Sequence, residues 1–190
     1  RQRREIIRRL QDDGVFEMNK ELELPIVPQR IAIISSPTAA GLQDFLDQLH
    51  NNLHQFVFYT KLFPAVMQGN EAPRSIMNAL DLIFEYEEMF DAVVIIRGGG
   101  AQIDLACFDQ YELAFNVAQF PLPVITGIGH DKDDTVIDMV ALTRMKTPTA
   151  VAEFLISGAL QFSQQLTELE NHFIELVNEQ LEENKNRLNI

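Results

Sequence analysis

The chain has 190 residues, 46% of them hydrophobic, which suffices for one α/β core with an appendage and excludes several independent domains. Its net charge of −13 argues against binding nucleic acid through a diffuse basic surface, so any such contact should be local or assisted by parts outside this chain. The single Cys107 excludes an internal disulfide and a cysteine-based metal site. No apolar run is long enough for a membrane span or a signal peptide, so we expect a cytoplasmic portion of a longer protein without membrane contact.

Residues 1–28 predict a lead-in helix followed by a linker. Gly14 is a suitable cap for the end of the helix. Pro25 and Pro28 then favour extended backbone before the main domain begins. The helix itself is indicated by apolar residues at helical spacing among arginines: Ile6, Ile7 and Leu10.

Residues 29–147 predict an α/β domain. The apolar, β-branched run at residues 30–35 is typical of a strand buried on both faces of a parallel sheet, and the Ser-Pro-Thr that follows offers caps for the next helix. Strands alternating with helices at this spacing imply βαβ units and a three-layer, mostly parallel sheet with flanking helices. Further strands are expected at residues 56–63, 92–96 and 123–126, and helices at residues 42–49, 72–86 and 105–117.

Residues 148–190 predict the start of an extended helical, coiled-coil region. Thr147 supplies a cap and Pro148 the first turn, and a continuous helix would extend about 60 Å. The first half of this helix could instead pack back on the sheet. For the Glu-rich far half we favour packing against a partner helix or against another copy of the chain. The seam is indicated by apolar residues in alternating steps of four and three: Leu155, Ala159, Phe162, Leu166, Leu169, Phe173 and Leu176.

Three loops fall at the carboxyl ends of the expected strands, where parallel sheets bind ligands. The clearest is the run of three glycines after Arg97, because residues without Cβ let backbone N–H groups approach an anion and Arg97 adds donors suited to phosphate. The alternative is a tight turn in which Arg97 pairs with a carboxylate. The Rossmann and P-loop fingerprints are both absent.

The loop after the fourth strand contains His130, the best acid–base candidate among four histidines. An imidazole that titrates near neutrality can accept or donate a proton, and a nearby carboxylate can hold its tautomer. The sequence requires no cofactor. Alternatively, Asp131, Asp133 and Asp134 could be the ligands of a magnesium ion, with Asp44 or Asp104 as a further ligand. Asp133 and Asp134 are otherwise N-terminal charge for a helix that begins near Thr135.

These loops resemble those of the exodeoxyribonuclease VII large subunit family. The resemblance covers about residues 25–160 and rests on four stretches in register, at residues 30–44, 94–100, 123–133 and 147–153. After the glycines the family tends to read Ser-x-Glu-Asp-Leu-Trp, whereas this chain reads Ala-Gln-Ile-Asp-Leu-Ala. The hydroxyl, one carboxylate and the Trp are therefore missing, and Asp104 is the retained acid.

The resemblance implies a nuclease that degrades single-stranded DNA from either end and releases oligonucleotides with 5′ phosphates. It implies a large subunit that works with many copies of a small helical subunit, with an OB-fold before this region and a helical recruiting region after it. The family's catalytic set falls on Asp44, Arg97, His130 and Asp133. We assign phosphate or DNA binding to Ser36, Thr38, Arg97, Gly98, Gly99, Gly100 and Asp104.

In the expected mechanism, Arg97 and the glycine amides hold the scissile phosphate and His130 acts as general acid or base, oriented by Asp133. Asp44 positions water, substrate or a metal ion. Two rivals stay open: a non-catalytic DNA- or nucleotide-binding and assembly module, and a nucleotide-dependent enzyme that holds a phosphate tail in the glycine loop. Self-association is expected through the C-terminal helix.

Overall fold

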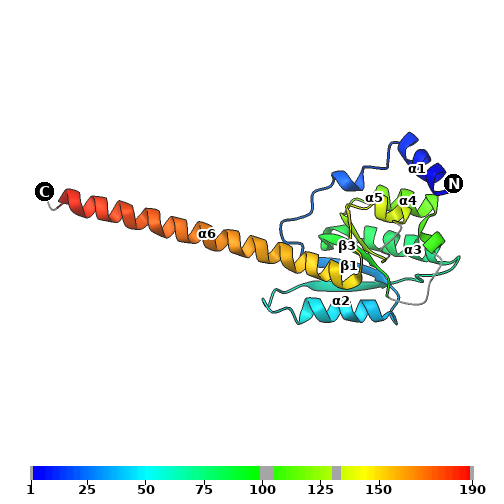
Figure 1. The fold of residues 1–190 in the computed structure, drawn as a ribbon, viewed down its shortest axis with the longest axis horizontal. Coiled ribbons are helices and arrows are strands. Elements are labelled where there is room, and N and C mark those ends of the chain that lie inside the picture. Colours follow the sequence, from blue (N-terminus) through cyan, green and yellow to red (C-terminus); the bar gives the residue numbers. More distant parts are fainter. Residues whose placement is uncertain (1, 99–104, 130–133, 189–190) are drawn as a thin grey trace.

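Five parallel strands form the sheet in the described part of the chain, in the order β2-β1-β3-β4-β5 (Figure 1). The computed structural model describes residues 2–98, 105–129 and 134–188. The strands are β1 (Arg30–Ser35), β2 (Tyr59–Pro64), β3 (Ala92–Ile96), β4 (Val124–Gly127) and β5 (Thr143–Arg144). The α/β class and the parallel sheet predicted from the sequence are confirmed.

The helices cover both faces of this sheet, and one of them extends far beyond it (Figure 1). The α-helices are α1 (Gln2–Asp12), α2 (Ala40–His50), α3 (Ala72–Phe84), α4 (Tyr111–Ala118), α5 (Val136–Val140) and α6 (Pro148–Leu188). Short 3₁₀ turns are η1 (Asn19–Glu21), η2 (Glu87–Met89) and η3 (Leu105–Phe108). The helix expected at residues 105–117 is thus divided into η3 and α4.

The central strands β1 and β3 read as continuous apolar runs because helices cover both faces of the sheet. In β1, Ile31 and Ile33 pack with α2 and the start of α6, whereas Ala32 and Ile34 point into the core formed with α3, α4 and α5. Both strands have the bounds that the sequence predicts. α1 adds Leu10 to the second of these cores.

The cap expected for α2 is wrong. Ala39 is the N-cap residue, and no side chain caps the helix. The preceding residues instead form a turn in which the Ala39 N–H donates to the Ser36 carbonyl at 3.1 Å. The hydroxyls of Ser36 and Thr38 face each other at 3.3 Å, so they do not serve the helix N-terminus.

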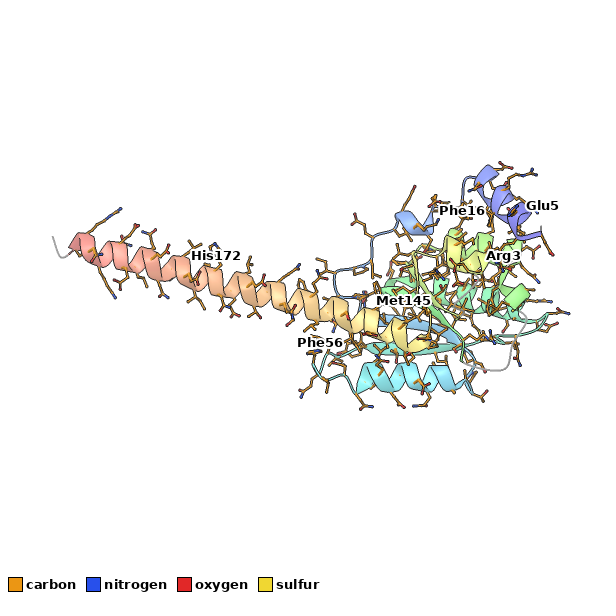
Figure 2. All side chains as sticks on the ribbon, viewed as in Figure 1. Arg3, Glu5, Phe16, Phe56, Met145 and His172 are labelled. Carbon is orange, nitrogen blue, oxygen red and sulfur yellow. The ribbon has the colours of Figure 1, made fainter. Side chains whose placement is uncertain are left out.

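α6 is one continuous helix, as predicted, but only its first turns are covered. Leu155 and Ala159 are buried against α2 and the sheet, which confirms packing on the sheet for this part. Farther along, Leu169 and Phe173 are 70% and 66% exposed. Figure 2 shows this far half, marked by His172, extending away from the α/β domain. Within the described residues, no helix is apolar enough over a sufficient length to span a membrane.

Asn19 joins the lead-in segment to the sheet through four hydrogen bonds. Its fully buried amide donates to the carbonyls of Phe120 at 3.0 Å and Leu122 at 2.9 Å. Its oxygen accepts from the N–H groups of Val124 at 2.9 Å and Leu142 at 3.0 Å. One side chain therefore satisfies backbone groups on both sides of β4.

Replacing Asn19 with Ala should lower the free energy of unfolding by about 2–4 kcal/mol, because it leaves several buried backbone groups without partners. Urea titration followed by circular dichroism measures the change. Asn178→Ala is the matched control, since Asn178 is exposed on the far half of α6. Equal stability of the two variants would contradict the role given to Asn19.

Candidate active site

The carboxyl ends of β1, β3 and β4 lie side by side at one edge of the sheet. The chain leaves β1 for β2 on one side and places β3 on the other, so the strand order reverses between β1 and β3. Such a switch point is where open parallel sheets bind ligands, because the loops diverge there. The loops that the sequence singled out follow these three strands.

Two glycines bring the first and second of these loops into backbone contact. A Cβ atom on Gly41, in α2, would lie 2.7 Å from the Gly98 Cα and 2.9 Å from the Pro148 Cγ. No L side chain fits such a distance, so this arrangement requires glycine. The contact places the start of α2, the loop after β3 and the start of α6 against one another.

A second close approach adds the loop after β4. A Cβ atom on Gly127 would lie 2.6 Å from the Val151 Cγ2 and 3.0 Å from the Ile96 Cγ2. Gly127, at the end of β4, therefore packs on both β3 and α6. Together the two glycine contacts join all four sequence stretches that carry the family resemblance.

Arg97 directly follows β3 and is buried at this edge with 9% of its surface exposed. Its backbone N–H donates to the Gly127 carbonyl at 3.3 Å. Its guanidinium group forms no hydrogen bond or ion pair with any other described residue. The alternative in which Arg97 pairs with a carboxylate thus has no support within the described ranges.

Arg30 shows the ordinary arrangement for comparison. Its guanidinium contacts Asp91 at 2.6 and 3.0 Å, and Asp91 also accepts from the backbone N–H groups of Gln29 and Arg30. Burial alone would raise the pKa of the Asp91 carboxyl, but these hydrogen bonds outweigh it and lower that pKa. Arg30 is half exposed and paired, whereas Arg97 has only 9% of its surface exposed and its guanidinium has no partner among the described residues.

A cavity of about 610 Å³ opens beside Arg97. Gly98, Ser36 and Thr38 line it, and their assignment to phosphate or DNA binding stays a prediction. Another wall consists of the last residue of β2 and the segment after it, residues 64–68, which were not predicted from the sequence. The signal was present, because this segment also follows the carboxyl end of a parallel strand.

Asp44 lies on α2, one turn after Gly41. α2 begins at Ala40, so Asp44 is in the second turn of the helix. Its carboxylate is exposed, does not line the cavity, and forms no ion pair or hydrogen bond with another described residue.

The structure fixes the residues on both sides of the segment 130–133. Before it, Gly129 has a φ of 82°, a conformation that favours glycine. After it, Asp134 forms an ion pair with Arg144. This pairing differs from the expected role of Asp134 as helix charge or metal ligand.

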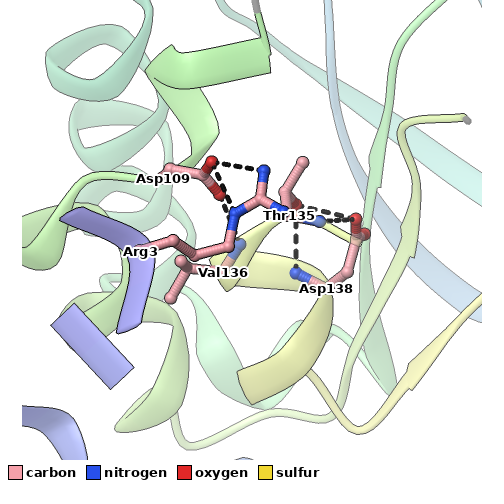
Figure 3. Close-up of polar contacts among 5 residues, drawn as sticks. All are labelled: Arg3, Asp109, Thr135, Val136 and Asp138. Atoms are coloured by element: carbon pink, nitrogen blue, oxygen red, sulfur yellow. Dashed lines mark hydrogen bonds and ion pairs between the residues drawn. The ribbon is translucent and has the colours of Figure 1, made fainter. Parts of the chain in front are cut away.

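Two carboxylates hold the start of α5 (Figure 3). The Asp138 carboxylate completes a capping box with Thr135. It also accepts a hydrogen bond from the Thr126 hydroxyl in β4 at 2.6 Å. Asp109 accepts from the Val136 N–H at 2.8 Å and from the Arg3 guanidinium at 2.7 and 2.9 Å. Sequence reasoning did not single out Asp109 or Asp138, because their partners are distant or structural.

Several predicted residues lie outside the described residues, and their roles stay predictions: Gly99, Gly100, Asp104, His130, Asp131 and Asp133. Within the described ranges, no group of three or more His, Cys, Asp or Glu side chains is arranged to hold a metal ion.

Residues 15–190 match the family model described as "Exonuclease VII, large subunit". The chain belongs to this family. A protein named exodeoxyribonuclease 7 large subunit from Nostoc sp. is 39% identical over 83% of the chain and 37% of the relative. Relatives of the same name from Campylobacter jejuni subsp. doylei and Koribacter versatilis are 35% and 32% identical over 95% of the chain, and over 46% and 39% of their own lengths. The chain thus spans less than half the length of these curated relatives.

Replacing Gly41 with Ala should lower the free energy of unfolding by about 1–3 kcal/mol, because the added methyl group must push α2 away from the Gly98 backbone. Gly158→Ala is the matched control. A Cβ there meets nothing within 4 Å, so it should stabilise α6 by about 0.5–1 kcal/mol. Thermal and urea unfolding compare the two, and shifts of the same sign would contradict the contact described above.

Proposed function

We propose that this chain is the catalytic part of a nuclease large subunit that hydrolyses phosphodiester bonds in single-stranded DNA. The proposal includes cleavage from either end and release of oligonucleotides with 5′ phosphates. Its main support is Arg97, a residue with only 9% of its surface exposed that lines the cavity at the switch point of the sheet and whose guanidinium has no counter-charge among the described residues. The names of the relatives, exodeoxyribonuclease 7 large subunit, agree with it.

In this proposal Arg97 and the backbone amides of residues 98–100 bind the scissile phosphate. They stabilise the negative charge that develops on its non-bridging oxygens in the transition state. His130 acts as general acid or base, Asp133 orients its imidazole, and Asp44 positions water or substrate. If the reaction uses magnesium, the residues that would hold it are Asp44, Asp131 and Asp133.

The proposed protein and DNA partners are supported by the exposed apolar surface of α6 and by the net charge of the chain. The far half of α6 exposes apolar side chains such as Leu169 and Phe173, which can pack against a partner helix. We propose the helical small subunit as this partner. The same helix could also mediate self-association of the large subunit. The net charge of −13 suits a chain that relies on another domain to grip the strand, and the buried single Cys107 agrees with a location in the cytoplasm.

Arg97→Met should lower the rate of single-strand cleavage about 100-fold or more while leaving the free energy of unfolding unchanged or raised. The rate falls because a donor to the phosphate is lost, and stability holds because methionine has a similar size and Arg97 has no ion pair to lose among the described residues. Labelled single- and double-stranded oligonucleotides, with and without EDTA, measure activity of the full-length large subunit with its small subunit.

Arg74→Met is the control, because Arg74 is exposed on α3 and does not line the cavity. Cleavage by Arg97→Met at the rate of this control would contradict the proposed function. Retained DNA binding without any cleavage by the unaltered complex would favour the non-catalytic binding and assembly module.

His130→Ala should abolish cleavage while leaving the affinity for single-stranded DNA unchanged, since a proton-transfer group acts in the chemical step more than in binding. Fluorescence anisotropy with a labelled oligonucleotide gives the affinity. His172→Ala, on the exposed far half of α6, is the matched control for activity. Cleavage by His130→Ala at the control rate would remove His130 from the mechanism.

A further inference from the structure

We infer that the cavity beside Arg97 receives one nucleobase of the DNA strand, next to the phosphate that is cleaved. This inference rests on the proposed function and adds a substrate subsite to it. The cavity lies between the turn after β1, residues 36–40, and the segment after β2, residues 64–68, with Arg97 and Gly98 also in its wall. At about 610 Å³ it falls within the range of small-molecule sites and is far larger than a phosphate needs.

The lining fits a flat apolar body with an anionic end. Pro37, Pro64, Val66 and Met67 supply apolar surface, and the thioether of methionine adapts well to a ring face. The charged side chain in the wall is Arg97, whose guanidinium has no other partner among the described residues. A nucleotide has this combination of a stacking face and a phosphate, and enzymes hold bases between such apolar side chains.

Polar groups that can read the edge of a base are also present. The Gln68 amide offers both donors and an acceptor, and the Ser36 and Thr38 hydroxyls can donate or accept. These groups lie in loops that are far apart in the sequence. Their convergence on one cavity is typical of a ligand site with a few placed polar groups in an apolar wall.

The wall after β2 is held in place without any ligand. The Ala65 N–H donates to the Ser35 carbonyl at 3.0 Å, which continues the pairing of β1 with β2. The Val66 N–H donates to the Ser75 hydroxyl at 2.8 Å, which fixes the segment to α3. These two hydrogen bonds tie this wall to β1 and α3, so a base that enters the cavity orders little of this segment.

The test fills the cavity from its mouth. Val66 lines the cavity yet is 48% exposed, so Val66→Trp places an indole there without replacing a core side chain. Val57→Trp is the matched control, because Val57 is 55% exposed, precedes β2 and does not line the cavity. Both variants are made in the full-length large subunit and assembled with the small subunit.

Binding is measured first, by thermal shift with thymidine 5′-monophosphate and with inorganic phosphate. The nucleotide should raise the melting temperature more than phosphate does, in the parent and in Val57→Trp, and this difference should disappear in Val66→Trp. Equal shifts from nucleotide and phosphate in the parent, or an unchanged difference in Val66→Trp, would overturn the inference. This binding measurement does not depend on DNA cleavage. It therefore tests the base-binding subsite even if the Arg97→Met variant shows that the proposed nuclease function is wrong.

Cleavage is measured second, on single-stranded oligonucleotides that carry one abasic position. In the parent and in Val57→Trp, cleavage of a bond beside the abasic position should be about tenfold slower than at the same bond with its base present. In Val66→Trp all bonds should be cleaved slowly and this difference should vanish. Normal cleavage beside the abasic position would overturn the subsite while leaving the nuclease function intact.

Discussion

The backbone contact between Gly41 and Gly98 is the constraint on which the rest of the site depends. α2 and the loop after β3 approach so closely that a Cβ added to Gly41 would lie only 2.7 Å from the Gly98 Cα, so this packing leaves no room for a side chain at Gly41. The contact of Gly127 with Val151 extends the same packing to β4 and α6. These two contacts set the position of Arg97 relative to the turn after β1, and so create the cavity between them.

Arg97 makes this edge of the sheet electrostatically unusual in an acidic chain. A buried guanidinium normally has a carboxylate partner, as Arg30 has in Asp91 even though Arg30 is half exposed. Arg97 has no such partner among the described residues. In the proposed function its donors bind the phosphate, which gives a chain with a net charge of −13 a local contact with DNA. The wider contact with DNA is then expected from another domain.

Local sequence patterns predicted the central fold well. β1 and β3 were recognisable because strands buried on both faces carry unbroken β-branched runs, and α6 because Thr147 and Pro148 start a long stretch without further proline. The Thr147 hydroxyl does accept from the Ala150 N–H, at 3.1 Å. β5 was missed because a strand of two residues leaves no periodic pattern.

Other features depend on tertiary structure and have no local signal. One of them is the absence of a side-chain cap on α2. Ser36 and Thr38 are good capping residues, but in the turn after β1 their hydroxyls contact each other and not the helix N-terminus. Asn19 meets its partners across more than a hundred residues of sequence, and Asp109 similarly joins α1 to the start of α5. In the candidate site, Arg97, Gly98, Ser36 and Thr38 were singled out from the sequence and line one cavity, and their roles stay predictions. The wall at residues 64–68 was overlooked, although it too lies at the carboxyl end of a parallel strand.

The central claim is that loops distant in sequence form one phosphate-binding site. The most direct measurement is an experimental structure with a bound phosphorothioate oligonucleotide, which resists cleavage. We expect a phosphate group within hydrogen-bonding distance of both Arg97 and the Gly98 backbone, with the His130 imidazole on the same side of the sheet. A phosphate bound elsewhere, or His130 directed away from it, would show that these loops do not form one phosphate-binding site.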